Sequence, residues 1–183
     1  MAKIQEIRCI RTRPGGYWAI VKVITDQPGL WGIGSANDVH HADTVTTAID
    51  KVIAPRLIGR DASEIEDIWQ SVYAAAYWRN GSILNTALGA IDMALWDIKG
   101  KEAGMPVYQL LGGKCRDAVP CYAHASGHDL DALVEDIQRY LEEGYPVVRC
   151  QLGSYGGGGF IDADAAPRPR NARAAEKVFD DEL

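Results

Sequence analysis

The sequence predicts an α+β domain followed by the beginning of an α/β domain. Three observations support this: strand signals fill residues 3–36, a helical period begins near residue 43, and a strand, a helix and a strand follow residue 116. We therefore expect one domain over residues 1–115, made of a three-stranded meander plus helices. Residues 116–183 are expected to hold the first βαβ portion of a second domain and a Gly/Pro-rich loop.

The first domain opens with three predicted strands, at residues 3–10, 17–24 and 30–34. The first two are rich in Ile and Val, and turn-forming residues at 14–16 and 26–29 separate the three. Short connections of this kind join antiparallel neighbours. The sequence therefore predicts an antiparallel meander.

Two helices are predicted next. Apolar residues spaced along one face run from Val45 to Ile53, and Pro55 is expected to interrupt that helix. A second apolar series covers residues 65–73, for which Ser63 or Asp61 is the expected N-cap.

A longer helix is predicted from about Ser82 to Ala103. Its apolar residues surround nearly the whole circumference, which favours a buried central helix. Gly104 and Pro106 follow and provide a helix stop.

The second domain is predicted to start with a strand at 119–124, a helix at 129–141 and a strand at 145–151. Such a unit normally has parallel strands joined right-handedly. A flexible loop at 154–160 and a solvated linker at 165–171 follow. One βαβ unit cannot cover its own apolar faces, so this second domain is expected to be incomplete.

Composition limits the possible partners. The formal net charge of −6 argues against a nucleic-acid polyanion and favours a small molecule. No apolar stretch approaches the roughly 20 residues that span a bilayer, and the amino terminus lacks a signal-peptide core. We expect no membrane partner and a cytoplasmic location. The four cysteines form no C-x-x-C pair and are expected to be small core residues.

Several sequence segments resemble one known family. Residues 90–101 (AIDMALWDIKGK) and 104–113 (GMPVYQLLGG) are similar to the capping-domain signature of the mandelate racemase and muconate lactonizing enzyme group of the enolase superfamily. Residues 65–70 (IEDIWQ), 76–81 (AYWRNG) and 122–127 (YAHASG) resemble its mannonate dehydratase branch, which includes galactonate-dehydratase-like and starvation-sensing members.

This resemblance implies an α+β capping domain over a modified TIM (β/α) barrel, with the site at the carboxyl ends of the barrel strands. It also implies a Mg²⁺ ion, held by acidic residues of the third, fourth and fifth barrel strands. The chain is expected to reach only the second strand, so the barrel is incomplete and no metal ligand matches. We expect this chain alone to be inactive.

The family chemistry implied is loss of water from a sugar acid such as D-mannonate or D-gluconate, giving a 2-keto-3-deoxy acid. A base removes the proton beside the carboxylate, and a general acid protonates the departing hydroxyl. The sugar acid is then the expected partner. A non-catalytic regulatory or ligand-binding protein of the same fold is the alternative, and a homo-oligomer is one open possibility.

Four residues are carried over as candidate site residues. His124 and Asn37 match substrate-contacting positions, although spacing to the flanking helix puts Val39 at the latter. Arg149 matches an arginine that would lower the pKa of a catalytic tyrosine, for which Tyr155 is the candidate. Each of three residues has a structural alternative. His124 is then a hydrogen-bonded structural histidine, Arg149 forms a salt bridge inside the barrel, and Tyr155 is an ordinary loop residue.

Two other groups of polar residues have a structural interpretation. Asp92, Asp97 and Lys99 lie in the recognised helix and are expected to fix packing between cap and barrel. The pair His40 and His41 lies in a loop before a helix and is expected to be solvated.

Overall fold

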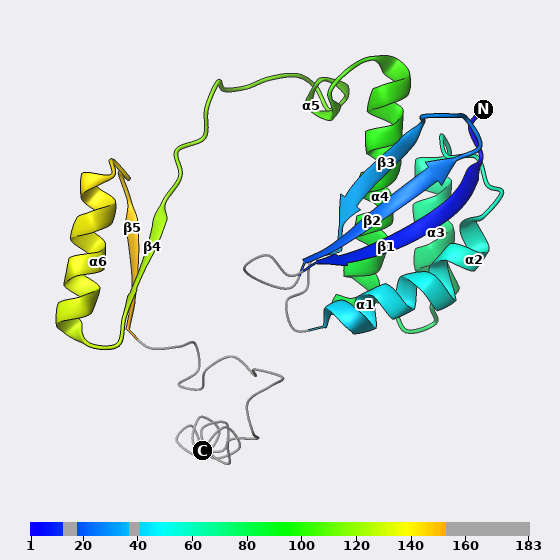
Figure 1. Cartoon of the computed structure of the whole chain (residues 1–183). Helices are drawn as coiled ribbons and strands as arrows, with labels where there is room; N and C mark the ends of the chain where they lie inside the picture. The colour runs from blue at the N-terminus through cyan, green and yellow to red at the C-terminus, as the bar shows by residue number, and fades with distance from the viewer. Residues whose placement is uncertain (13–17, 37–40, 153–183) are drawn as a thin grey trace, which may run out of the picture. The chain divides into compact units, whose positions relative to one another are not determined.

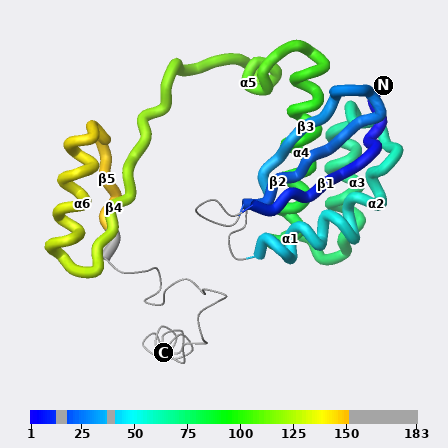
Figure 2. Tube along the Cα trace, in the orientation of Figure 1, coloured from blue at the N-terminus to red at the C-terminus, as the bar shows by residue number. Residues whose placement is uncertain are grey.

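The computed structural model describes residues 1–12, 18–36 and 41–152. The chain divides into two compact units, Met1–Cys115 and Arg116–Leu183 (Figure 1, Figure 2).

The first unit begins with an antiparallel sheet of strands β1 (Ile4–Thr12), β2 (Trp18–Thr25) and β3 (Trp31–Ser35). The strands lie in the order β1-β2-β3, and β2 pairs with both neighbours. The predicted meander is confirmed. Alternate residues of β2 are buried (Ala19, Val21, Val23 and Thr25), so one face of the sheet belongs to the core.

Helix α4 (Ser82–Ala103) packs against that buried face of the sheet, at very close range to β3. A Cβ atom placed on Gly34 would lie 1.9 Å from the carbonyl oxygen of Ala90, and one on Gly32 would lie 2.0 Å from that of Ala94. The two glycines of β3 therefore let the helix backbone approach the strand.

The predicted bounds of α4 are confirmed, and Gly104 ends the helix in the left-handed conformation with φ 63°. The apolar circumference is only partly buried, however. Leu84 is 38% exposed and Met93 is 45% exposed, so the helix is central on one side and open on the other.

Pro55 does not end the first helical segment, contrary to the sequence prediction. Helix α1 (Ala42–Ala48) continues through a π-helical turn η1 (Ile49–Ile53) into α2 (Ala54–Leu57). Proline lacks an N–H and crowds the carbonyl four residues earlier. The wider π turn directly ahead of it provides the local change of hydrogen-bond register that lets the helix continue.

Helix α3 (Ile65–Ala75) forms as expected, but neither predicted cap is used. Its N-cap is Glu64, without a side-chain cap hydrogen bond. The Asp61 carboxylate instead accepts from the backbone N–H and the hydroxyl of Ser63, at 2.9 and 2.8 Å. This local turn occupies both candidate side chains before the helix begins.

The core of the first unit is built by β1, β2 and all its longer helices. Its largest fully buried side chains are Ile4, Val21, Val23, Val45, Ile49, Leu57, Ile68, Ile91, Leu95 and Ile98. Each such side chain stabilises the fold by about 1.5–3 kcal/mol relative to its exposed state. A short helix α5 (Val107–Leu110) follows α4.

Asp97 and Lys101 fasten α4 to β3. The Asp97 carboxylate accepts from the backbone N–H of Ile33 at 2.9 Å and from Lys101 Nζ at 2.8 Å. Lys101 Nζ also donates to the carbonyl oxygen of Trp31 at 2.7 Å. The ammonium groups of Lys101 and Lys22 both lie over the Trp31 indole ring. Asp97 therefore acts within the first unit, whereas the sequence predicts a role in packing between domains.

The second unit contains β4 (Ala123–Gly127), α6 (Leu130–Glu142) and β5 (Val148–Leu152). The two strands are parallel, as predicted. The first strand begins at Ala123, later than the predicted residues 119–124. Pro120 has no N–H for a ladder, and residues 119–122 pair with no described strand.

Only one of the four cysteines is a core residue, so the sequence prediction is wrong for three. Cys9 is half-buried against the core, whereas Cys115, Cys121 and Cys150 are exposed.

Candidate functional site

The candidate site residues of the second unit lie on a two-stranded sheet with one covered face. Helix α6 packs against both strands (Figure 1). Ala123 and Ala125 of β4 are buried, at 6% and 0% exposed, together with Leu133 of α6. The side chains between them, His124 and Ser126, are exposed and belong to the opposite face.

His124 and Arg149 are direct neighbours across the two strands. The register of β4 and β5 pairs His124 with Arg149 and Ala123 with Val148. Paired residues of a parallel ladder project to the same face, so the imidazole and the guanidinium share the face away from α6. The structure thus brings together two of the four residues that the sequence singled out.

The strand positions differ from expectation. His124 is the second residue of β4, and Arg149 is the second residue of β5. The sequence predicts both near strand ends, because the predicted strands 119–124 and 145–151 begin and end earlier than β4 and β5 do. Asn37 and Tyr155 lie outside the described residues.

Local sequence fixes the turn from β4 into α6. A Cβ atom on Gly127 would lie 2.4 Å from the backbone nitrogen of Leu133, so this position requires glycine. Asp129 is the N-cap of α6, and its carboxylate accepts from the N–H of Ala132 at 2.9 Å. The turn is therefore short and tied to the helix.

Asp136 of α6 connects the helix to the strand that carries His124. Its Oδ2 accepts from the backbone N–H of Ser126 at 3.1 Å, and its Oδ1 accepts from Arg139 Nη2 at 2.6 Å. The Arg139 guanidinium and, after it, the Ser126 N–H hold the pKa of this carboxyl below its ordinary value.

Replacing Arg139 by glutamine is expected to raise the pKa of Asp136 toward the ordinary aspartate value of about 3.9. Because the folded-state pKa lies below that of the unfolded chain, the carboxylate stabilises the fold above about pH 4. That stabilisation is lost as the pH falls through the folded-state pKa. The amide chemical shift of Ser126, followed by NMR during an acid titration, reports the midpoint. An unchanged midpoint in Arg139→Gln would contradict this assignment.

The described residues offer no metal site. Among residues 1–12, 18–36 and 41–152, no group of three or more His, Cys, Asp or Glu side chains could hold a metal ion. Asp43, which follows the histidine pair, forms an ion pair with Arg11 and is largely exposed.

Ser126 is a further polar residue of this face that the sequence motifs did not single out. It lies two residues after His124 on the same exposed face of β4. The two-residue alternation of a strand is the signal that predicts this, once the strand is known to extend to Gly127.

None of the described helices has the length and apolar character needed to cross a membrane.

Comparison with known proteins gives consistent results. Residues 8–112 match the mandelate racemase / muconate lactonizing enzyme N-terminal domain. A D-galactonate dehydratase family member from Paenibacillus sp. (strain JDR-2) is 61% identical over 182 residues, which is 100% of this chain and 45% of that protein. A D-galactonate dehydratase family member from Musicola paradisiaca is 55% identical over 161 residues, covering 87% of this chain and 39% of that protein.

Solved structures resemble the chain as well. The crystal structure of an enolase from Pantoea ananatis, with bound D-gluconate and Mg, superimposes with a TM-score of 0.81 at 49% identity. The match covers 88% of this chain and 39% of that one. The chain thus spans less than half the length of these relatives.

Proposed function

Since the chain belongs to the mandelate racemase/muconate lactonizing enzyme group of the enolase superfamily, in its D-galactonate dehydratase-like branch, we propose that it is part of an acid-sugar dehydratase. The substrate is a sugar acid of the D-mannonate or D-gluconate type. The product is the corresponding 2-keto-3-deoxy acid, and the cofactor is Mg²⁺.

The pairing of His124 with Arg149 is the observation that carries this proposal. An imidazole and a guanidinium side by side on one open face can bind a substrate that has both hydroxyls and a carboxylate. The Pantoea ananatis relative, whose structure contains D-gluconate and Mg, supports the choice of ligand class.

Two roles are proposed for Arg149 on that face. Its guanidinium binds an anionic oxygen with two parallel N–H groups, and its charge stabilises the ionised form of a nearby phenol. Tyr155, which follows β5 in sequence, is the proposed phenol and base. His124 hydrogen-bonds a substrate hydroxyl, and Asn37 of the first unit is a further proposed substrate contact.

The described residues do not fit a Mg²⁺ site, because they contain no suitable group of ligands. The ligands of the proposed metal must therefore come from outside the described residues. What the described residues contribute is the orientation of the sugar acid and a positive charge beside it.

A chimera tests the proposal. Residues 1–152 of this chain are joined to the remaining sequence of the Paenibacillus relative, which aligns with the whole chain at 61% identity. The purified chimera, supplied with Mg²⁺ and either D-gluconate or D-mannonate, is expected to form a 2-keto-3-deoxy acid, measured as its semicarbazone.

In the same chimera, Arg149→Gln is expected to lower kcat/KM about 30-fold, because a charge-assisted contact to the reacting region is lost. His124→Asn is expected to act mainly on KM. The matched control is Arg116→Gln, which removes one exposed guanidinium of the second unit with no hydrogen bond to a described residue.

Other outcomes decide against the dehydratase. Binding of D-gluconate without product favours the non-catalytic alternative, provided that the unmodified relative turns it over. Equal activity of Arg149→Gln and Arg116→Gln would show that Arg149 does not contact the substrate and would contradict the proposal.

A further inference from the structure

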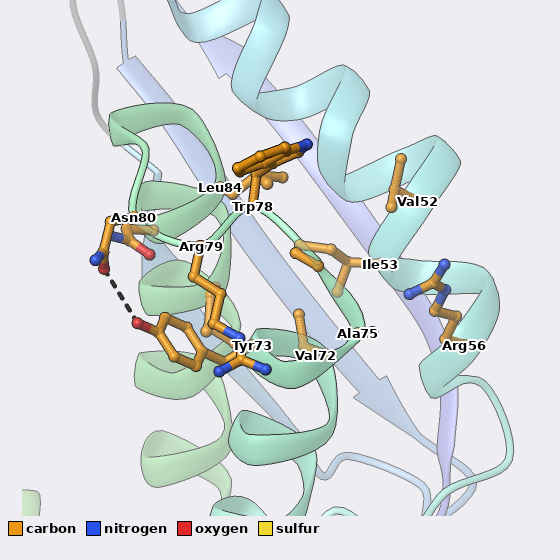
Figure 3. Close-up of a pocket in the computed structure, with 13 residues that line it drawn as sticks. Val52, Ile53, Arg56, Val72, Tyr73, Ala75, Trp78, Arg79, Asn80 and Leu84 are labelled. Carbon is orange, nitrogen blue, oxygen red and sulfur yellow. Dashed lines mark hydrogen bonds between the residues drawn. The ribbon is translucent and has the colours of Figure 1, made fainter.

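A cavity of about 110 Å³ lies within the first unit, among η1, α2, the end of α3, the loop after it and the start of α4 (Figure 3). Most of its lining is apolar and includes Ile53, Val72, Leu84 and Leu88. Ile53 and Leu88 are nearly inaccessible to solvent, at 2% and 4% exposed. An apolar group placed there would be removed from water on most sides.

Two arginines line the same cavity, Arg56 from α2 and Arg79 from the loop. Figure 3 shows them on opposite sides of the space, with Val72 and Ala75 between. Neither guanidinium forms a hydrogen bond or ion pair with any described residue, and no Asp or Glu lines the cavity. In a chain of net charge −6, two cations without an acidic partner favour an anion at this place.

The loop that presents Arg79 is held in a defined shape. Tyr73 Oη donates a hydrogen bond to Asn80 Oδ1 at 3.1 Å, and the Arg79 guanidinium lies 5.7 Å from the Tyr73 ring centroid. Asn80 has φ 67°, a left-handed conformation that costs a non-glycine residue free energy. The neighbouring indole of Trp78 is 84% exposed, although it lines the cavity.

These features define a ligand class. The volume accommodates one six-membered ring. The uncharged polar side chains of the lining, Tyr73, Asn80 and Asn85, are too few to pair all the hydroxyls of a sugar acid. The two guanidiniums match a carboxylate, for which arginine forms paired hydrogen bonds. The exposed Trp78 indole can cover the ring.

We propose that this cavity binds a small organic anion that carries one apolar ring and one carboxylate. The ring occupies the space above Ile53 and Leu88. The carboxylate is bound by Arg56 or Arg79 at the rim. This inference is independent of the proposed dehydratase activity.

Benzoate is the probe for the first experiment, titrated into the full 183-residue chain and followed by two-dimensional NMR. We expect saturable binding with a Kd on the order of 1 mM, as for a good ligand of this size. The shifted amides are expected around Tyr73 and Leu84. D-gluconate at the same concentration is expected not to compete.

Variants locate the site. Arg56→Gln and Arg79→Gln are each expected to raise the Kd about fivefold, since each loses a charged partner at a partly exposed rim. Ala75→Leu fills the space and is expected to abolish binding, while both arginines remain. Lys51→Gln removes a nearby exposed charge that does not line the cavity, and it is expected to leave the Kd unchanged.

Several results would overturn the proposal. They are the absence of saturation at concentrations tenfold above that Kd, an unchanged Kd in both arginine variants, and full binding by a folded Ala75→Leu chain. The proposal also fails if sedimentation shows that the chain is a dimer with this face buried between the copies. In that case Ala75→Leu would dissociate the dimer and leave the Kd for benzoate unchanged.

Discussion

Replacing Gly34 by alanine is expected to lower the free energy of unfolding of the first unit by about 3 kcal/mol. The added Cβ would lie 1.9 Å from the carbonyl oxygen of Ala90, and the obstacle is helix backbone, which cannot move aside like a flexible side chain. Strand β3 and helix α4 would have to separate. For a unit of this size the melting temperature is expected to fall by about 15 °C.

Gly89→Ala is the matched control. Gly89 lies inside α4, and a Cβ atom there meets nothing within 4 Å. Alanine in a helix interior is favoured over glycine, so this variant is expected to stabilise the unit by about 0.5–1 kcal/mol. Circular dichroism of the full chain during heating measures both. Equal melting temperatures for the two variants would show that β3 and α4 do not approach each other as closely as the structure indicates.

Alkylation at pH 8 is expected to spare Cys9 while it labels Cys115, Cys121 and Cys150. Burial and the nearby Asp50 carboxylate raise the pKa of Cys9 to about 12. Since the thiolate is the reactive form, its fraction at pH 8 is on the order of a thousand times smaller than for a free cysteine thiol. The other three thiols are exposed.

Mass spectrometry of iodoacetamide-treated chain, sampled over time and digested, gives the rate at each cysteine. Denaturant provides the control, because all four cysteines are then expected to react alike. Rapid labelling of Cys9 in the folded chain would mean that β1 is less firmly packed against the helical segment of Thr46 and Asp50 than the structure indicates.

Long periodic segments were predictable from sequence. The match to residues 8–112 and the Pantoea ananatis structure confirm the expected capping domain followed by the start of the barrel. The meander, α4 and the βαβ order needed only the spacing of apolar residues and the positions of turn formers. These signals are local, so no tertiary information was required.

The errors occurred where tertiary contacts decide. The sequence predicts a helix stop at Pro55, but a π turn earlier in the helix accommodates the proline. Residue type alone predicts Cys115 and Cys121 in a core, although they lie in a segment with little packing around it. Composition gives an average preference for burial and cannot tell which individual residue has neighbours.

The candidate site was predictable in part for a similar reason. Family motifs singled out His124 and Arg149, and the strand register places them side by side. The sequence did not predict which residues of the two strands pair, and it placed the beginning of β4 too early. Arg56 and Arg79 could not be paired from sequence, because the cavity between them exists only once α2, α3 and α4 have packed.

Among the residues that the structure describes, the core of the first unit is formed by residues from Ile4 to Ile98. All these residues are translated before the strands of the second unit, and no described residue after Ile98 belongs to this core. We therefore expect this unit to fold on the ribosome, while the following segment is still inside the exit tunnel. The strands that carry His124 and Arg149 would then leave the ribosome only after the first unit has folded.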